Sequence, residues 1–279
     1  MRTEKYDVVV VGGGAAGVAA AVGSSRRGAR TLLVERYGFL GGEAANANVL
    51  SYCGFYVRGD ACRRVVGGVG AAVLSELAAL GFDVDPIRAP SGNWIVMLDP
   101  EAIKYAIDRV AAVDGLDCRL HCSLVGAHTA AGRLHAVSLH DGAGRFDVEA
   151  GAFVDASGDA NLGFAAGVPP MRDLQPERVR QVASFPVRFC GVPPEVSVDR
   201  AELAALMPDF RSLKPVMCKK LPISNVTSRQ WTFLCLSVVM NSRLLSTRFS
   251  LYNGAQEKTM DNASFFVMVD SALLCVFTK

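Results

Sequence analysis

The stretch VVVVGGGAAGVAAA, residues 8–21, sets three glycines between a β-branched run and a segment rich in alanine. The consecutive glycines are Gly12, Gly13 and Gly14, and Gly12, Gly14 and the later Gly17 have the spacing G-x-G-x-x-G. The valine run predicts a strand buried on both faces of a parallel sheet, and residues 15–27 have the composition of a helix. In such a unit the first glycine allows a tight turn, the second lets a pyrophosphate approach the backbone, and the third lets the helix pack on the strand. The stretch therefore predicts a dinucleotide-binding turn.

A second strand is predicted over ARTLLVE, residues 29–35, and it ends at Glu35. A carboxylate at this position accepts hydrogen bonds from ribose hydroxyls and repels a phosphorylated ribose. A solvated glutamate at a strand end is the alternative interpretation. The pattern supports binding of an adenine dinucleotide, and it leaves FAD and NAD both open.

The residues that follow predict more helices and a β-meander. One helix is expected over residues 68–80, and Asp99 can cap the N-terminus of another, with Pro100 in its first turn. The apolar face of this second helix would be formed by Ile103, Ile107 and Val110. Residues 117–155 alternate polar and apolar side chains between short turns, which predicts an antiparallel meander that feeds a parallel strand, AFVDAS.

Three segments together resemble FAD-dependent oxidoreductases of the glutathione-reductase-like two-dinucleotide-binding superfamily. They are residues 8–42, which include ERYGFLGG, then NWIVMLDPEAIKYAIDRV at 93–110 and GAFVDASGDANLGFAAGVP at 151–169. The resemblance covers residues 5–170 and implies an α/β fold: a Rossmann-like FAD-binding domain with a parallel sheet and an antiparallel β-meander. It also implies non-covalently bound FAD.

The resemblance assigns cofactor contacts to four parts of the chain. The pyrophosphate of FAD would be held by Gly12, Gly14, Ala15, Ala16 and Gly17. The adenosine ribose would be held by Glu35, with Arg36 beside it, and the segment near the pyrophosphate and ribityl chain would contain Gly41 and Gly42. The backbone facing the adenine would be that of Val125. The later turn near the cofactor would consist of Ala156, Ser157, Gly158 and Asp159.

Composition bounds the class of protein. The 279 residues are 51% hydrophobic and 20% charged, with a net charge of +2, which is typical of a globular protein and argues against a nucleic-acid partner. The longest apolar runs, at 231–240 and 264–277, are shorter than the ~20 residues of a membrane helix, and the N-terminus has no secretory signature. We expect a cytoplasmic protein with a small-molecule substrate, no membrane association and no assigned oligomeric state.

The eight cysteines include no C-x-x-C pair, so we expect reduced thiols and no metal site. Cys118, His121 and Cys122 are close in sequence, and the alternation around them predicts a strand on which the two cysteines share one face and His121 points to the other. Cys53 is the one thiol expected near the flavin, but its neighbours do not suggest an activated thiolate. No catalytic residue is assigned.

The last part of the chain differs in composition. Residues 1–213 hold every glycine except Gly254, and residues 214–279 carry eight Lys or Arg against three Asp or Glu. We expect a FAD-binding domain at 1–170, the start of a substrate domain at 171–213, and an atypical tail at 214–279. An interrupted reading frame or splice pattern near residue 213 explains that tail better than a divergent cap does, and no complete substrate domain is recognisable.

Three functions fit the sequence. The first is a FAD-dependent oxidoreductase that transfers a hydride or an electron pair through the flavin. The second is a truncated, non-catalytic nucleotide-binding protein. The third is an NAD-dependent dehydrogenase, which the matches around Gly41 and Gly158 disfavour.

Overall fold

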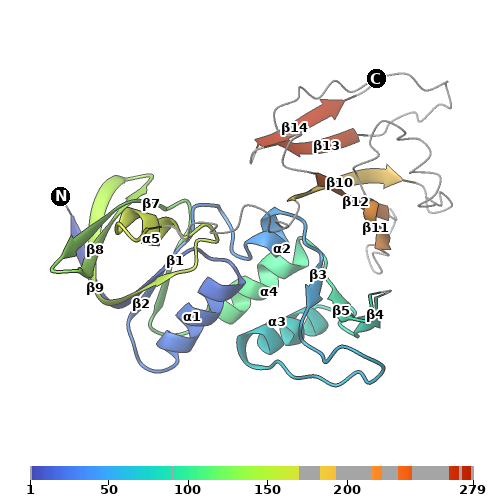
Figure 1. Cartoon of the computed structure of the whole chain (residues 1–279), viewed down its shortest axis with the longest axis horizontal. Coiled ribbons are helices and arrows are strands. Elements are labelled where there is room, and N and C mark those ends of the chain that lie inside the picture. Colours follow the sequence, from blue (N-terminus) through green and yellow to red (C-terminus); the bar gives the residue numbers. More distant parts are fainter. Residues whose placement is uncertain are drawn as a thin grey trace. The chain divides into compact units, whose positions relative to one another are not determined.

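The computed structural model describes residues 2–89 and 91–169 in full and, beyond them, the backbone of five strands (Figure 1). The chain divides into two compact units, Met1–Asp173 and Leu174–Lys279. The predicted start of a substrate domain and the predicted tail therefore lie outside the fully described residues.

The first unit alternates strands and helices, as expected for an α/β fold. Its elements in chain order are β1 (Thr3–Val11), α1 (Ala15–Ser25), β2 (Thr31–Val34), α2 (Glu43–Asn46), β3 (Ser51–Cys53), α3 (Gly68–Ala79), β4 (Ile87–Arg88), β5 (Trp94–Met97), α4 (Ala102–Ala111), β6 (Leu116–Arg119), β7 (Ser123–Ala130), β8 (Arg133–Asp141), β9 (Gly144–Asp155) and α5 (Asn161–Ala165).

A six-stranded sheet organises this unit, in the order β6-β2-β1-β9-β8-β7. β1 lies between β2 and β9 and is parallel to both, and β6 extends the parallel part beside β2. β9, β8 and β7 form the antiparallel meander. The expected combination of a parallel sheet and a meander is thus confirmed. A second, three-stranded sheet has the order β3-β5-β4.

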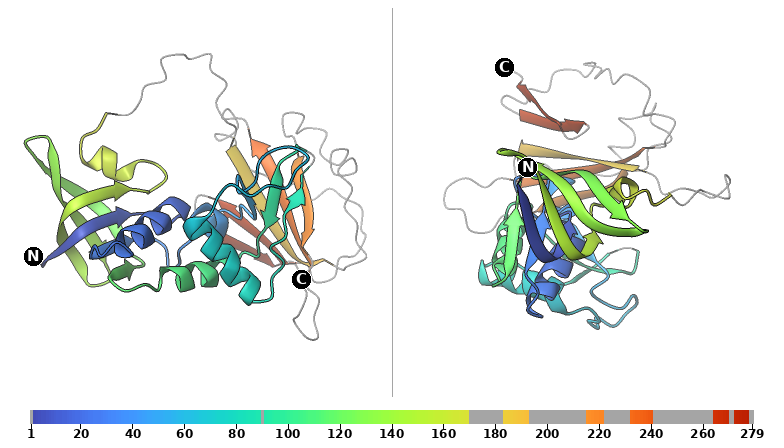
Figure 2. Two further views of the ribbon diagram at one scale, coloured as in Figure 1. Left: turned by 90° about the horizontal axis from the view of Figure 1, so that it is seen from below. Right: turned by 90° about the vertical axis from the view of Figure 1, so that its left-hand side faces the viewer.

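Alternate side chains of β1 pack on opposite faces of the sheet. Val10 belongs to a buried cluster with residues of α1, α3 and α4, and Val9 and Val11 belong to another with residues of the meander and α5. The views in Figures 1 and 2 show these three helices gathered together and the meander next to the N-terminus. A strand buried on both faces needs a continuous apolar run, which explains the four consecutive valines.

The two predicted helices beyond the glycine turn are confirmed as α3 and α4. Asp99 performs the expected capping, because its carboxylate accepts hydrogen bonds from the backbone N–H of Glu101 and Ala102 at 2.9 and 2.8 Å. The predicted apolar face of α4 is buried, with exposed fractions of 0, 2 and 5% for Ile103, Ile107 and Val110.

One expectation about these strands is wrong. Residues 117–119, placed in the meander by their alternation, belong to β6 and join the parallel part of the sheet, because they pair with β2. The predicted parallel strand AFVDAS is confirmed as the end of β9, whose first part pairs with β8 while residues 147–155 pair in parallel with β1. Local alternation cannot reveal which neighbour a strand will pair with.

The second unit contains a five-stranded antiparallel sheet in the order β11-β12-β10-β13-β14. Its strands are β10 (Ala183–Val192), β11 (Pro215–Leu221), β12 (Thr232–Met240), β13 (Ser264–Val269) and β14 (Ala272–Phe277). In the part of the chain that the structure describes, no helix has the length and apolar character needed to cross a membrane.

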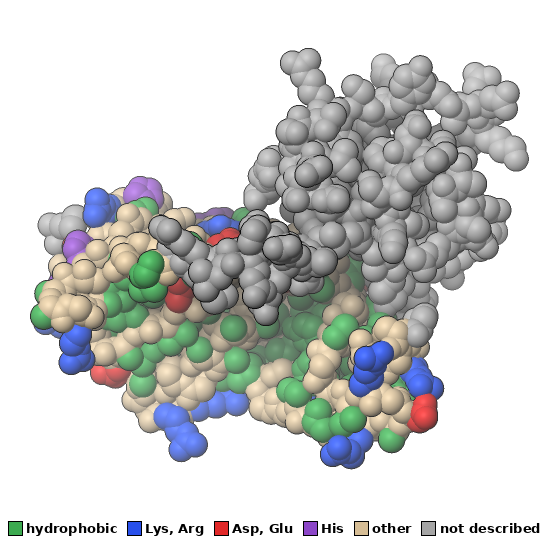
Figure 3. Space-filling view, in the orientation of Figure 1, with side chains coloured by type: hydrophobic (Ala, Val, Ile, Leu, Met, Phe, Trp, Pro, Cys, Tyr) green, Lys and Arg blue, Asp and Glu red, His purple; other side chains and the backbone are tan. Residues whose placement is uncertain are grey.

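The surface of the first unit mixes polar and apolar side chains, as Figure 3 shows for one face. Large hydrophobic side chains are exposed at several separate places along the chain, including Val49, Tyr105 and Phe164. Exposed hydrophobic side chains are common on the surfaces of globular proteins.

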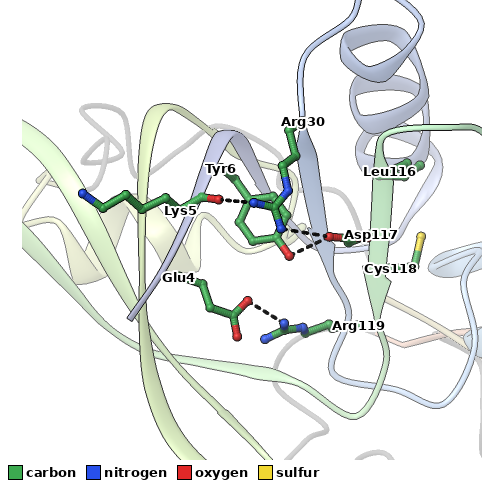
Figure 4. Close-up of a pocket in the computed structure, with 8 residues that line it drawn as sticks. All are labelled: Glu4, Lys5, Tyr6, Arg30, Leu116, Asp117, Cys118 and Arg119. Atoms are coloured by element: carbon green, nitrogen blue, oxygen red, sulfur yellow. Dashed lines mark hydrogen bonds and ion pairs between the residues drawn. The ribbon is translucent and has the colours of Figure 1, made fainter. Parts of the chain in front are cut away.

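Charged side chains gather around an open pocket of about 600 Å³ beside the amino end of β1 and along β6 (Figure 4). The Tyr6 hydroxyl donates a hydrogen bond to the Asp117 carboxylate at 2.7 Å, and the Arg30 guanidinium lies 4.4 Å from the centroid of the Tyr6 ring. Arg119 pairs with Glu4 beside them. Burial, followed by the hydrogen bond to Asp117, raises the pKa of Tyr6 from 10.0 to about 12.

We expect alkaline pH to destabilise the protein through Tyr6. Because the pKa of Tyr6 is about 12 in the folded protein and 10.0 otherwise, the unfolded chain loses this proton first, and the free energy of unfolding falls as pH rises between these values. Tyr6→Phe removes this contribution, so its stability should fall less steeply over the same range. Urea unfolding of both proteins at several pH values checks this, and equal pH slopes would contradict it.

Candidate functional site

Three backbone segments meet at the carboxyl ends of β1, β2 and β9. The backbone N–H of Gly12 donates to Val34 O at 2.8 Å, and that of Ala156 donates to Val11 O at 2.8 Å. The N–H of Gly41 donates to Gly13 O at 2.9 Å. The turn after β1 is therefore joined to the loop after β2 and lies beside the turn after β9. Carboxyl ends of parallel strands on either side of a central strand are where open α/β sheets bind ligands.

The turn after β1 needs glycine for steric reasons. Gly12 has φ +102°, and a Cβ added to it would lie 2.3 Å from Ala156 O. A Cβ on Gly17 would lie 1.8 Å from Gly12 O. The first turn of α1 thus rests directly on the end of β1, which is the predicted role of the third glycine.

The loop after β2 approaches the same turn through Gly41 and Gly42. Both have positive φ, at +121° and +51°. A Cβ on Gly42 would lie 2.8 Å from Gly14 Cα, whereas a Cβ on Gly14 would lie 3.7 Å from Gly42 Cα. The two glycine segments are in contact backbone to backbone, and Gly14 keeps free space on its own side.

The N-terminus of α1 is left open at this junction. Gly14 is its N-cap, and among the described residues no side chain caps the helix and no acidic residue lies in its first turn. Ala15 and Ala16 are exposed there. Uncapped N–H groups and the helix dipole favour an anion at such an end. These residues therefore fit the pyrophosphate of a dinucleotide.

Glu35 is a buried carboxylate, with an exposed fraction of 6%. Its Oε2 accepts a hydrogen bond from the N–H of Gly13 at 2.7 Å, and its Oε1 accepts one from the N–H of Tyr37 at 2.9 Å. A carboxylate has about four acceptor positions. Glu35 can thus hold the glycine turn in place and still accept hydrogen bonds from ribose hydroxyls. Arg36 is exposed, and its guanidinium lies 4.9 Å from the centroid of the Tyr37 ring.

The turn after β9 is organised by Asp155. Its Oδ1 accepts a hydrogen bond from the Ser157 hydroxyl at 2.6 Å, and its Oδ2 accepts one from the N–H of Gly163 at 2.9 Å. Burial acts to raise the pKa of Asp155, but these hydrogen bonds outweigh it and hold that pKa below its ordinary value. Gly158 has φ +85°, and Asp159 is exposed. Ser157 is therefore engaged in shaping the turn.

Val125 lies apart from these turns along the chain, on the edge strand β7, with an exposed fraction of 50%. The chain enters β7 next to Glu35, because the N–H of Cys122 donates to Glu35 O at 2.9 Å. The predicted contacts are thus distributed over one edge of the sheet and the adjoining start of the meander. Their binding to a cofactor stays a prediction.

The expected strand through residues 118–122 is wrong. β6 ends at Arg119, β7 begins at Ser123, and His121 between them has φ 51°. Cys118 is exposed and Cys122 is buried, so the two do not share a face. Burial raises the pKa of Cys122 to about 11, with Asp141 acting in the same direction, which keeps the thiol protonated at neutral pH.

The described residues contain no group of three or more His, Cys, Asp or Glu side chains that could hold a metal ion. Cys53 is exposed on β3. Sequence reasoning missed Gly13, although it links two segments: its N–H binds Glu35 and its carbonyl accepts the N–H of Gly41. A Cβ on Gly13 would lie 2.5 Å from Leu40 Cδ2. The signal available in the sequence was the third consecutive glycine, GGG, which the G-x-G-x-x-G spacing does not require.

A family model described as FAD dependent oxidoreductase matches residues 7–263. The chain belongs to the FAD-dependent oxidoreductase family. The matched range extends beyond residue 170, where the resemblance in the sequence ended, and reaches into residues 214–279. The family binds FAD. The turns at the carboxyl ends of β1, β2 and β9 have the geometry expected for a dinucleotide of this kind.

Several solved structures have a similar fold. A geranylgeranyl bacteriochlorophyll reductase-like protein from Thermoplasma acidophilum is 18% identical with a TM-score of 0.49, over 85% of this chain and 57% of that chain. BexE is 17% identical with a TM-score of 0.50, over 82% and 43%. OxyS anhydrotetracycline hydroxylase from Streptomyces rimosus is 16% identical with a TM-score of 0.47, over 84% and 45%.

The likeness to these structures concerns the fold alone. The chain spans about half the length of each, between 43% and 57%. No curated protein matches this sequence.

We expect Gly17→Ala and Gly23→Ala, two substitutions in the same helix, to have opposite effects on stability. At Gly17 the methyl group meets Gly12 O, so the variant should lose ~3 kcal/mol or more of unfolding free energy. At Gly23 nothing lies within 4 Å, so alanine should stabilise α1 by about 0.5–1 kcal/mol. Urea unfolding measures both, and equal stability of the two variants would contradict the close packing of α1 on β1.

Proposed function

We propose that this chain binds FAD non-covalently and acts as an oxidoreductase on a small-molecule substrate. The observation that carries the proposal is the open N-terminus of α1, which lies against Gly42 and beside the buried carboxylate of Glu35. This combination provides donors for two phosphates and acceptors for one ribose within a single edge of the sheet. FAD, when bound, supplies the acceptor for a hydride or an electron pair.

Each chain segment has a distinct part in this binding. The backbone N–H groups at Gly14, Ala15 and Ala16 hold the pyrophosphate by hydrogen bonding and by the helix dipole. Glu35 binds the adenosine ribose and disfavours a 2′-phosphate by charge repulsion. Gly41 and Gly42 keep side chains away from the pyrophosphate and the ribityl chain.

The contact between the loop after β2 and the turn after β1 favours FAD over NAD as the cofactor. The sequence resemblance to FAD-dependent oxidoreductases assigns Gly41 and Gly42 to FAD binding. It also places the turn at residues 156–159 next to the same cofactor. Membership of the FAD-dependent oxidoreductase family supports the same choice. An absorption spectrum of the purified protein, followed by denaturation and identification of any released nucleotide, tests it. Released FAD supports the proposal, and a protein that takes up NAD but no flavin overturns it.

A non-catalytic nucleotide-binding protein is the second candidate, because the site consists of binding groups and no catalytic residue is assigned to the chain. Reduction of a dye acceptor by the FAD-loaded protein, with NADH or NADPH as donor, separates the two. Turnover above that of free FAD supports the oxidoreductase. Bound FAD without turnover of any donor favours the binding protein.

We expect Gly14→Ala to reduce the affinity for FAD while the protein stays folded. The added methyl group meets only Gly42 Cα at 3.7 Å, so loss of stability should be limited to the ~1 kcal/mol that alanine costs at an N-cap. The same methyl group would occupy the space next to the pyrophosphate, so the dissociation constant should rise about tenfold or more. Gly23→Ala is the matched control and should bind FAD like the wild type. Flavin fluorescence titration measures both, and unchanged affinity of Gly14→Ala would contradict the pyrophosphate assignment.

We also expect Glu35→Ala to weaken FAD binding, because it removes the acceptor for the ribose and the partner of the Gly13 and Tyr37 N–H groups. Loss of hydrogen bonds to a charged group corresponds to about tenfold or more in affinity. ADP, titrated by calorimetry, should show the same loss, because it carries the same ribose. Wild-type affinity for both ligands would contradict the assignment of Glu35.

A further inference from the structure

His121 has an unusual backbone conformation at the edge of the sheet where the cofactor is proposed to bind. Its φ is 51°, in the left-handed region that residues with a Cβ rarely adopt. For a residue other than glycine this conformation costs ~1–2 kcal/mol and persists only where the surroundings impose it. His121 follows β6, the neighbour of β2, whose carboxyl end carries Glu35.

Backbone hydrogen bonds explain what imposes the conformation. The N–H of His121 donates to Tyr37 O at 3.0 Å, and the N–H of Cys122 donates to Glu35 O at 2.9 Å. On the other side, the N–H of Glu35 donates to Arg119 O at 2.8 Å. The chain around His121 therefore continues the pairing of β6 with β2 past the end of both strands, as far as Tyr37.

The ring of His121 lies against the backbone of Gly38. A Cβ added to Gly38 would be 2.7 Å from His121 Nε2 and 2.8 Å from its Cε1. Gly38 does not have a positive φ, so its own backbone conformation does not call for glycine. His121 and Gly38 are both exposed, and the His121 ring occupies the space that a Cβ on Gly38 would need.

The segment that His121 holds contains both proposed contact regions of the loop after β2. Glu35 lies at its start, and Gly41 and Gly42 lie at its end. His121 contacts this segment between those two regions, through its hydrogen bond to Tyr37 O and through its ring next to Gly38. Any displacement of Gly38 would be transmitted to the ribose acceptor or to the pyrophosphate loop, because only a few residues separate them.

We propose that His121 is a positioning residue that holds residues 35–42 in the geometry needed for the adenosine end of a dinucleotide, through its ring on Gly38 and its backbone bond to Tyr37. This inference rests on the proposed FAD site, but its structural part concerns the cofactor-free protein and can be measured there.

The first experiment measures the loop without cofactor. His121→Asn retains a residue that tolerates positive φ and removes the two ring atoms that a Cβ at Gly38 would meet most closely. The N–H of Gly41, bonded to Gly13 O, should then exchange its hydrogen about tenfold faster or more, because its segment opens locally more often. His140→Asn, at an exposed histidine on β8, is the matched control and should leave this rate unchanged. Unchanged exchange in His121→Asn would overturn the proposal.

The second experiment is a double-mutant cycle with Gly38→Ala. When His121 is present, the methyl group added by Gly38→Ala would meet the ring. This variant should therefore accelerate hydrogen exchange at Gly41 and raise the dissociation constants for FAD and ADP about tenfold, which is the size of coupling found between neighbouring residues. In the His121→Asn background the same substitution should have little further effect. Equal effects in both backgrounds would overturn the role of the ring.

The two proposals fail separately. If the wild type binds neither FAD nor ADP, the proposed cofactor site is wrong, and hydrogen exchange in the cycle still decides whether His121 holds the loop. If the wild type binds both ligands and the cycle shows no coupling in either exchange or affinity, the role of His121 is wrong and the cofactor site stands.

Discussion

The first unit depends on the close approach of backbone segments at the carboxyl end of β1. Gly12 lies against Ala156, Gly17 against Gly12, and Gly42 against Gly14, at distances that leave no room for a Cβ at Gly12, Gly17 or Gly42. This contact fixes how α1 rests on the sheet and how the loop after β2 returns to it. It also leaves the N-terminus of α1 bare. The same constraint therefore determines the packing of the fold and creates a place where an anion can approach main-chain N–H groups.

Glu35 links the glycine turn to the proposed binding of the cofactor's ribose. A buried carboxylate is stable only when hydrogen bonds compensate for its lost hydration, and here the N–H groups of Gly13 and Tyr37 provide them. The carboxylate is thus held in place before any ligand arrives, and its remaining acceptor positions fit the free ribose hydroxyls of the proposed cofactor. Preorganisation of this kind reduces the cost of ordering the site on binding.

The two ends of the parallel strands differ in chemistry. At the amino end of β1, charged side chains pair with residues of β6, as in Glu4 with Arg119, and Arg30 pairs with Asp117 beside them (Figure 4). At the carboxyl ends, the glycine turns present backbone, with the charge of Glu35 directed inward. The charges near the amino end of β1 are engaged with one another, and the uncapped helix makes the carboxyl ends the better place for the phosphates of the proposed cofactor.

The sequence by itself determined the parts of this protein that depend on local chemistry. The glycine spacing, the valine strand, Glu35 at the end of β2 and the apolar face of α4 could all be predicted, because each follows from a residue's own conformational range or from the period of its element. The pairing of β6 with β2, the two partners of β9, the bonds of Gly13 and the ring of His121 on Gly38 could not. These features depend on which distant segments become neighbours. That is decided by the tertiary structure, because hydrogen-bond partners and free volume are determined by the packing of the whole unit.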